Sequence, residues 1–239
     1  MKACCVTDKG SVRTLNEDYY YLPQYGENFA AVADGMGGHA AGEVASRMAA
    51  NTLAANLRKH TEDMNEQTLR DAFAAANESV CAAASADNAK KGMGTTLTAL
   101  VFCCRTAYVA HVGDSRAYLY RGGKLRQVTT DHSYVEELVA NGIITRAQAA
   151  THPKRNLITR CVGMPQGFET DVYKLDNKNN DIWLLCSDGL VKYVTDEEIS
   201  AVLSGRDSLG QKINTLKDMA LTRGGSDNIT VMAVNGGSD

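Results

Sequence analysis

Several classes of protein are excluded by features that this 239-residue chain lacks. No apolar run approaches the roughly 18 residues that a membrane helix needs, and residues 1–8 become polar too early for a signal peptide. A basic surplus is also missing, since the net charge is −3 and the pI is about 6.0. Because general nucleic-acid binders carry excess positive charge, we expect a cytoplasmic protein that binds neither nucleic acid nor membrane.

The chain also lacks the patterns of a disulfide framework or of a zinc site. Its seven cysteines are an odd number with no Cys-x-x-Cys pair, and its five histidines form no His-x-His or His-Glu-x-x-His pattern. We therefore expect reduced thiols. Five of them lie in apolar strand-like runs, where a thiol packs as a small hydrophobic group: Cys4, Cys5, Cys103, Cys104 and Cys186.

What the chain does contain is an alternation of strand-like and helix-like blocks. Apolar stripes of helical period predict helices around residues 42–57, 69–80, 199–203 and 209–220. Thr145 and Thr195 each open a capping-box pattern at a helix start. Short apolar runs predict strands at 3–7, 19–22, 28–33, 95–103, 106–112, 116–121, 124–128, 168–174, 181–186 and 229–234. Because tight turns separate many of these strands, we expect antiparallel sheets with helix pairs on their outer faces, in one α+β domain.

Four aspartates stand where apolar strand-like runs stop or start. Asp34 follows residues 29–33, Asp114 follows 108–113, Asp188 follows 182–187, and Asp227 precedes 229–234. Carboxylates that converge at the rim of a sheet repel one another unless cations lie between them. An all-oxygen ligand set favours magnesium, manganese or calcium. The pattern therefore predicts a metal site.

Each of these motifs also has a purely structural interpretation. Asp34 opens the glycine-rich segment 33–42, which fits a strand-to-helix turn, and Asp114 fits a β-hairpin. Residues 187–190 match a type I′ turn, and residues 224–230 match a helix C-cap followed by a strand. Arg13 suits bidentate recognition of a phosphate, but a lone arginine also forms surface ion pairs.

Taken together and in order, the motifs resemble those of the metal-dependent serine/threonine protein phosphatases of the 2C type, in their compact bacterial form. The resemblance covers essentially the whole chain. It rests on Val12-Arg13 with Asn16-Glu-Asp18, Ala33-Asp-Gly-Met-Gly-Gly-His39, Gly94-Thr-Thr96, Val112-Gly-Asp-Ser-Arg116, Ser187-Asp-Gly189 and Gly225-Ser-Asp-Asn228. It implies a four-layer α-β-β-α sandwich, in which helices flank two central antiparallel β-sheets. Residues 1–239 would form one catalytic domain, with a flap subdomain at about 132–165.

The same resemblance implies a role for each metal-binding residue. Asp34 would bridge two Mn²⁺ or Mg²⁺ ions, and the Gly35 carbonyl would bind one of them. Asp188 and Asp227 would complete the ligands of the second ion. Asp114, together with Asp188, matches the positions that bind a third, weaker ion in bacterial members.

Other residues would act around these ions. Glu17 and Asp18, with Asn228 beside them, would hold metal-bound waters in an outer shell. Arg13 would bind the substrate phosphate. A bridging water, activated by the metals, would attack phosphorus in line, so that no phosphoenzyme forms. The expected substrates are phosphoserine and phosphothreonine in proteins modified by a bacterial Ser/Thr kinase, and the expected enzyme is a monomer.

Two departures from the family leave alternatives open. Met36 stands where eukaryotic members have a histidine that is proposed as the general acid. His39 is the nearest substitute, and it is interpreted either as that acid or as a structural histidine at the helix start. Cys161 stands where many relatives have a small or apolar residue, which is consistent with a redox role or with packing. A catalytically weak phosphoprotein-binding module and an anti-sigma-factor phosphatase are the alternative functions on this scaffold.

Overall fold

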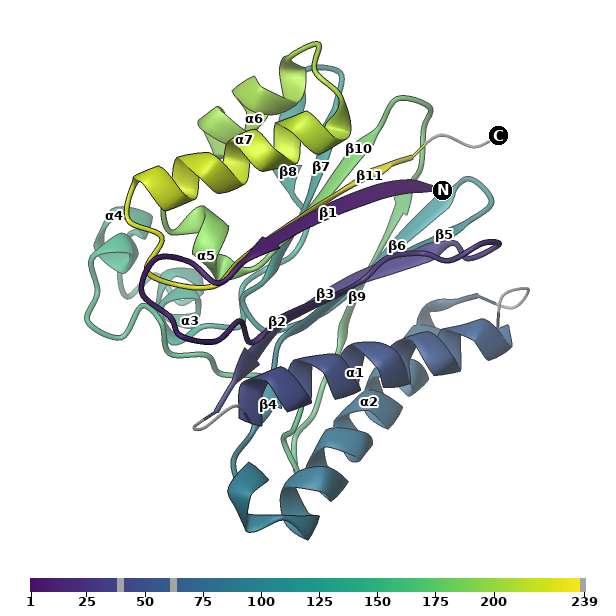
Figure 1. The fold of residues 1–239 in the computed structure, drawn as a ribbon, viewed down its shortest axis with the longest axis vertical. Coiled ribbons are helices and arrows are strands. Elements are labelled where there is room, and N and C mark those ends of the chain that lie inside the picture. The colour runs from purple at the N-terminus through teal and green to yellow at the C-terminus, as the bar shows by residue number, and fades with distance from the viewer. Residues whose placement is uncertain (38–40, 61–63, 237–239) are drawn as a thin grey trace.

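The computed structural model of the protein describes residues 1–37, 41–60 and 64–236. It contains two antiparallel sheets packed face to face between two layers of helices (Figure 1). This is the predicted α+β sandwich. The first sheet has five strands in the order β1 (Lys2–Asp8), β11 (Ile229–Asn235), β10 (Ile182–Cys186), β7 (Arg116–Arg121) and β8 (Lys124–Gln127). The second has six strands, with β2 (Asp18–Tyr21), β3 (Phe29–Met36), β5 (Leu97–Cys103), β6 (Thr106–Val112) and β9 (Asp171–Asp176) in order and β4 (Gly94–Thr95) paired to β3.

The helices divide between the two outer faces and one end of the sandwich (Figure 1). The second sheet is covered by α1 (Ala41–Leu57) and α2 (Glu66–Ala86), and the first by α6 (Asp196–Ser204) and α7 (Leu209–Thr222). At one end lie α3 (Tyr134–Ala140), α4 (Arg146–Ala150) and α5 (Asp188–Val191), and short 3₁₀ turns occupy Arg58–His60 and Asn88–Lys90. No helix among the described residues combines the length and the apolar character needed to cross a membrane.

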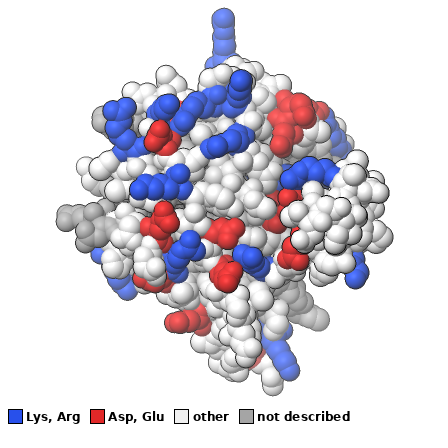
Figure 2. All heavy atoms as spheres, turned by 180° about the vertical axis from the view of Figure 1, so that it is seen from behind, with Lys and Arg blue, Asp and Glu red and all other residues white. Residues whose placement is uncertain are grey.

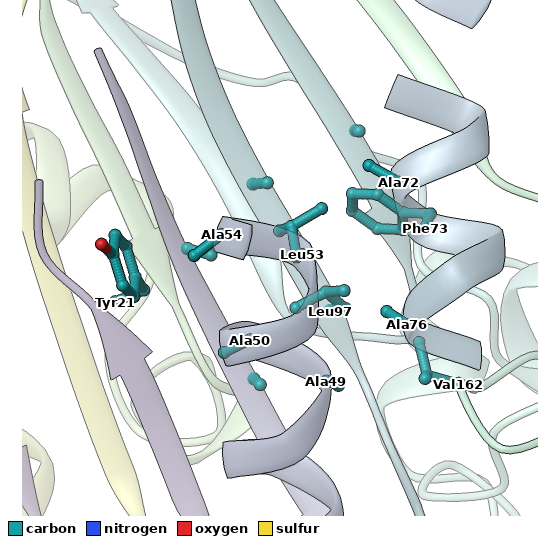
Figure 3. Packing of buried hydrophobic residues seen from close by; sticks show 14 of the residues in the cluster. Tyr21, Ala49, Ala50, Leu53, Ala54, Ala72, Phe73, Ala76, Leu97 and Val162 are labelled. Atoms are coloured by element: carbon teal, nitrogen blue, oxygen red, sulfur yellow. The ribbon is translucent and has the colours of Figure 1, made fainter. Parts of the chain in front are cut away.

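Three hydrophobic cores hold the layers together, one between the sheets and one under each helix pair. Under α1 and α2, alanines such as Ala49 let the helix backbone approach the sheet, while Leu53 and Phe73 fill the space between the helices (Figure 3). Between the sheets, Trp183 of β10 is fully buried, and its indole N–H donates to the Asn177 side chain at 3.3 Å. The central strands of both sheets are therefore buried on both faces.

Local differences from the predicted elements occur where tertiary contacts override the pattern. Asp34 and Gly35 do not follow a strand but lie within β3, because β2 and β4 pair with them. The predicted strand 95–103 is interrupted at Thr96, whose N–H bonds to the Asp34 carbonyl at 2.8 Å. Cys104 does not pack in a strand; it is exposed in a turn with a φ of 53°.

The segment 132–165 lies over the end of the sandwich and adds no buried residue from α3 or α4. Its ends are tied to the body by backbone bonds, from His132 N–H to the Gly113 carbonyl at 2.7 Å and from Val162 N–H to the Thr95 carbonyl at 2.8 Å. The Thr145 capping box is present at the start of α4. On the face drawn in Figure 2, acidic and basic side chains are interspersed.

Candidate active site

Five aspartates from distant parts of the sequence meet at one end of the two sheets. Asp18 and Asp34 are direct cross-strand neighbours on β2 and β3, and Asp188 begins α5 at the end of β10. Asp114 lies between β6 and β7, and Asp227 lies just before β11. A cavity of ≈ 230 Å³ opens among four of them, Asp18 excepted, and its lining includes Arg13, Glu17, Asp34, Gly35, Asp114, Asp188, Lys192, Asp227 and Asn228.

The topology decides between the alternative interpretations of these motifs. Asp114 does not occupy a hairpin, because β6 and β7 belong to different sheets and the chain crosses between them there. Residues 187–190 do not form a type I′ turn, because α5 begins at Asp188. The predicted C-cap at 224–230 is confirmed: Gly225 N–H bonds to the Ala220 carbonyl at 3.0 Å and Gly224 N–H to the Leu221 carbonyl at 3.1 Å.

Several of the carboxylate oxygens are buried without a hydrogen-bond partner. This holds for one oxygen each of Asp18, Asp114 and Asp188 in the described part of the chain. Burial, followed by repulsion from neighbouring aspartates, raises the pKa of Asp34 well above its ordinary value. The same causes raise the pKa of Asp114 to about 8, and burial raises that of Asp18 to about 7 despite hydrogen bonds from Ser187 and Thr230. Ionising these carboxyls together is therefore costly, and bound cations would offset that cost.

Two basic side chains provide part of this compensation. Arg13 Nη2 lies 2.9 Å from Asp227 Oδ1, and Lys192 Nζ lies 2.7 Å from both Asp188 Oδ2 and Asp227 Oδ2. Burial alone would raise the pKa of Asp227, but the hydrogen bonds from Lys192 and Arg13 outweigh it and the pKa is lowered. For Asp188 burial dominates, and its pKa stays raised.

The donor set fits divalent cations such as Mn²⁺ or Mg²⁺. Its orphaned oxygens are hard, negatively charged and enclosed, which is what these ions prefer. As the side chains now stand, no three acidic, histidine or cysteine groups within the described ranges are gathered closely enough to ligate one ion. Asp188 and Asp227 instead face Lys192, which offsets the mutual repulsion of the carboxylates.

The segment that carries Arg13 and Glu17 is positioned by Asn228. The Asn228 Oδ1 accepts from Glu17 N–H at 2.8 Å, and its Nδ2 donates to the Lys9 and Leu15 carbonyls, each at 2.9 Å. Glu17 also accepts a backbone hydrogen bond from Gly42, although burial leaves its pKa raised. These hydrogen bonds tie residues 9–17 to Asn228, and they hold Arg13 beside the cavity.

The comparisons with known proteins agree with this geometry. Residues 10–219 match the sequence pattern of the family described as Protein phosphatase 2C. The chain belongs to the protein phosphatase 2C family. It is 38% identical to the serine/threonine phosphatase stp of Listeria welshimeri, with 95% of this chain and 93% of that protein covered.

Solved structures of protein phosphatases 2C share the whole fold. The crystal structure of the Mycobacterium tuberculosis serine/threonine phosphatase PstP/Ppp matches with a TM-score of 0.91 and 38% identity, covering 98% of this chain and 97% of that chain. A structure of the catalytic domain of PstP, in complex with two manganese ions, matches with a TM-score of 0.85 and 36% identity, covering 98% and 97%.

The sequence left the roles of two residues open, His39 and Cys161. His39 lies outside the described residues, so its role as a general acid stays a prediction. Cys161 is partly buried, and burial, followed by the charge of Cys81, raises the pKa of its thiol. A protonated, partly buried thiol favours the packing interpretation.

Sequence reasoning missed Lys192 at the site of this phosphatase and Asn77, which anchors the segment beside it. Lys192 contacts Asp188 and Asp227. Residues four apart on a helix are neighbours, so the first contact could have been predicted if a helix had been expected after Ser187. Asn77 of α2 accepts hydrogen bonds from Gly163 and Met164 N–H at 2.7 and 3.0 Å, which holds the end of segment 132–165. No local signal in the sequence marks that long-range anchor.

Acid sensitivity of the fold is predicted at His111, which is fully buried on β6. Its Nδ1 is 2.9 Å from Thr98 Oγ1, its Nε2 has no partner among the described residues, and its ring lies 4.9 Å from that of His132. Burial, followed by the charge of His132, lowers the pKa of His111 to about 3. The unfolded chain therefore binds this proton first as the pH falls below about 6.5, and stability is lost from there down to the folded pKa.

Replacing His111 with Asn should remove this contribution. Between pH 7.5 and pH 5 the wild-type free energy of unfolding should fall by about 2 kcal/mol more than that of His111→Asn. Urea denaturation at both pH values measures the difference, with the exposed His60→Asn as the control. Equal pH dependence of wild type and His111→Asn would contradict the assignment.

Proposed function

We propose that this chain is a metal-dependent protein phosphatase that hydrolyses phosphoserine and phosphothreonine in proteins. The observation that carries the proposal is the enclosed carboxylate cluster with orphaned oxygens, which lies next to a cavity of ≈ 230 Å³ that Arg13 also lines. The names of its relatives as serine/threonine phosphatases support it. A binding module without turnover is not favoured, because every carboxylate that the resemblance predicts lines the cavity or, for Asp18, lies opposite Asp34.

In this proposal the cluster holds two divalent ions, as in the manganese-containing PstP structure. The ions would be held by the Asp34 carboxylate, the Gly35 carbonyl, Asp188 and Asp227, which are the ligands that the resemblance implies. Such ions, when bound, lower the pKa of a water to supply a nucleophile and neutralise charge on a phosphoryl group. Glu17 and Asp18 orient waters from behind, and Ser187 orients Asp18 through a hydrogen bond of 2.8 Å.

Arg13 receives the phosphate in this proposal. Its side chain is 49% exposed at the mouth of the cavity, and its partner Asp227 is only 19% exposed. A guanidinium has more donors than this one ion pair uses, so it can bind a phosphate oxygen from its open side. Binding there would hold the phosphoryl group against the carboxylate cluster and favour in-line attack.

A wider groove beside the carboxylates would accommodate the polypeptide of a protein substrate. A cavity of ≈ 660 Å³ continues from the carboxylates along segment 132–165 and is lined in part by Val135, Arg146 and Arg155. This segment would act as the predicted flap beside the bound polypeptide. The proposed substrates are the products of a Ser/Thr kinase, and the enzyme is proposed to act in the cytoplasm as a monomer. The resemblance also implies a third ion beside Asp114 and Asp188, where Lys192 already contacts Asp188.

Phosphate release from peptides tests the proposal. Phosphothreonine and phosphoserine peptides, with p-nitrophenyl phosphate as a generic substrate, should be hydrolysed with Mn²⁺ or Mg²⁺ and left intact with a chelator. A phosphotyrosine peptide of the same sequence is the matched control, and it should be a poor substrate. Turnover that persists after complete removal of metal would refute the mechanism, and tight binding of phosphopeptide without turnover would favour the regulatory module.

A further inference from the structure

Lys192 places a positive charge inside the carboxylate cluster. It stands at the C-terminal end of α5, one helical turn after Asp188. Its Nζ lies 2.7 Å from Asp188 Oδ2 and 2.7 Å from Asp227 Oδ2, and the side chain is only 23% exposed. The ammonium therefore bridges two carboxylates that the proposed function assigns to metal binding.

The two oxygens of Asp188 have different surroundings. Oδ2 is engaged by Lys192, whereas Oδ1 is buried with no hydrogen-bond partner in the described ranges. The free oxygen is thus available to the pair of ions, and the oxygen facing Lys192 is already bound to a cation. Asp114 belongs to the same arrangement, because it lines both cavities together with Lys192.

The charge of Lys192 also acts on Asp114, because the two side chains line the same two cavities. The predicted third ion would lie beside Asp114 and Asp188. A divalent ion placed there would have to displace the ammonium from Asp188 or lie close to it, and like charges at such short range repel strongly.

We propose that Lys192 is a tethered cation that takes the place of a third metal ion, so that this enzyme works with two ions. The inference rests on the proposed function. Lys192 caps the short helix that Asp188 begins, so its ammonium is always close to this carboxylate. Such a tethered group has a high effective concentration, and its charge therefore stays beside Asp188 at any metal concentration. Lys192 acts through Asp188 and Asp227, and is therefore a positioning residue.

Counting bound Mn²⁺ ions tests the inference without relying on activity. Equilibrium dialysis with metal analysis, followed by calorimetric titration, should give two ions per chain for wild type and for Lys192→Arg, which keeps the charge. Lys192→Met should bind a third ion at least about tenfold more tightly than wild type does. The third ion should be lost again in Lys192→Met/Asp114→Asn. Lys90→Met, which removes a surface ion pair with Asp87, is the control.

The outcomes separate the inference from the function on which it rests. Three ions of equal affinity in wild type and Lys192→Met would overturn the inference, and so would two ions in both. No Mn²⁺ binding by folded wild type would overturn the proposed function itself. Circular dichroism checks that each variant is folded, and if Lys192→Met fails to fold, a third ion bound by Lys192→Gln decides in its favour and two ions decide against it.

Discussion

Replacing Asp34 with Asn is expected to lower metal-dependent phosphatase turnover by about a thousandfold or more. The side chain keeps its size, and the hydrogen bonds that hold this position are made by its backbone. The Asp34 N–H donates to Thr96 Oγ1 at 2.9 Å, and the Asp34 carbonyl accepts from Thr96 N–H at 2.8 Å. The fold should therefore survive. What is lost is the negative charge that the proposed mechanism places between the two ions, and an amide oxygen is a much weaker ligand.

The same substitution should stabilise the metal-free protein. Asp34 lies opposite Asp18 and near Asp188, so removing its charge relieves repulsion within a buried cluster. Turnover should fall while the melting temperature in chelator rises. Asp87→Asn is the matched control, because an asparagine can also accept the hydrogen bond from Ala89 N–H that Asp87 accepts at 2.9 Å. Asp34→Asn with at least half the wild-type turnover would show that this carboxylate does not bridge catalytic ions.

Replacing Gly35 with Ala should cost about 3 kcal/mol of stability and abolish activity with it. A methyl group at this position would lie 2.1 Å from the Gly42 carbonyl oxygen and 2.6 Å from that of Glu17. Both atoms belong to the backbone, one at the start of α1 and the other on the segment that carries Arg13. Neither can turn away as a side chain could, so β3 and α1 must separate at the site.

Gly210 is the control, because its replacement by alanine is expected to change stability in the opposite direction. Gly210 lies in the first turn of α7, and a methyl group there would meet no atom within 4 Å. Gly210→Ala should raise stability by up to about 1 kcal/mol, because alanine is the better helix former. Urea denaturation and phosphate release measure both variants. A Gly35→Ala protein as stable as wild type would show that the close contact between β3 and α1 is not needed.

The periodicity and motifs of the sequence determined most of the fold and the chemical type of the site. Strands near Cys4, Tyr108 and Met232 and the helices through Leu53 and Leu216 followed from local apolar period, because that pattern is the condition for burying one face of an element. The aspartates at the strand ends indicated a cation site, because carboxylates that converge at a buried rim repel one another unless cations lie between them. The ordered motifs identified the family.

Only the tertiary structure decided which groups meet and which oxygens are satisfied. The crossing at Asp114 between the two sheets, the anchor from Asn77 and the contact of Lys192 with Asp188 and Asp227 depend on pairs of residues brought together by folding. Local spacing contains no information about the partner that a distant segment supplies. The balance of charge in the cluster is therefore a property of the folded chain, and it is this balance that makes Lys192 a candidate for the third cation.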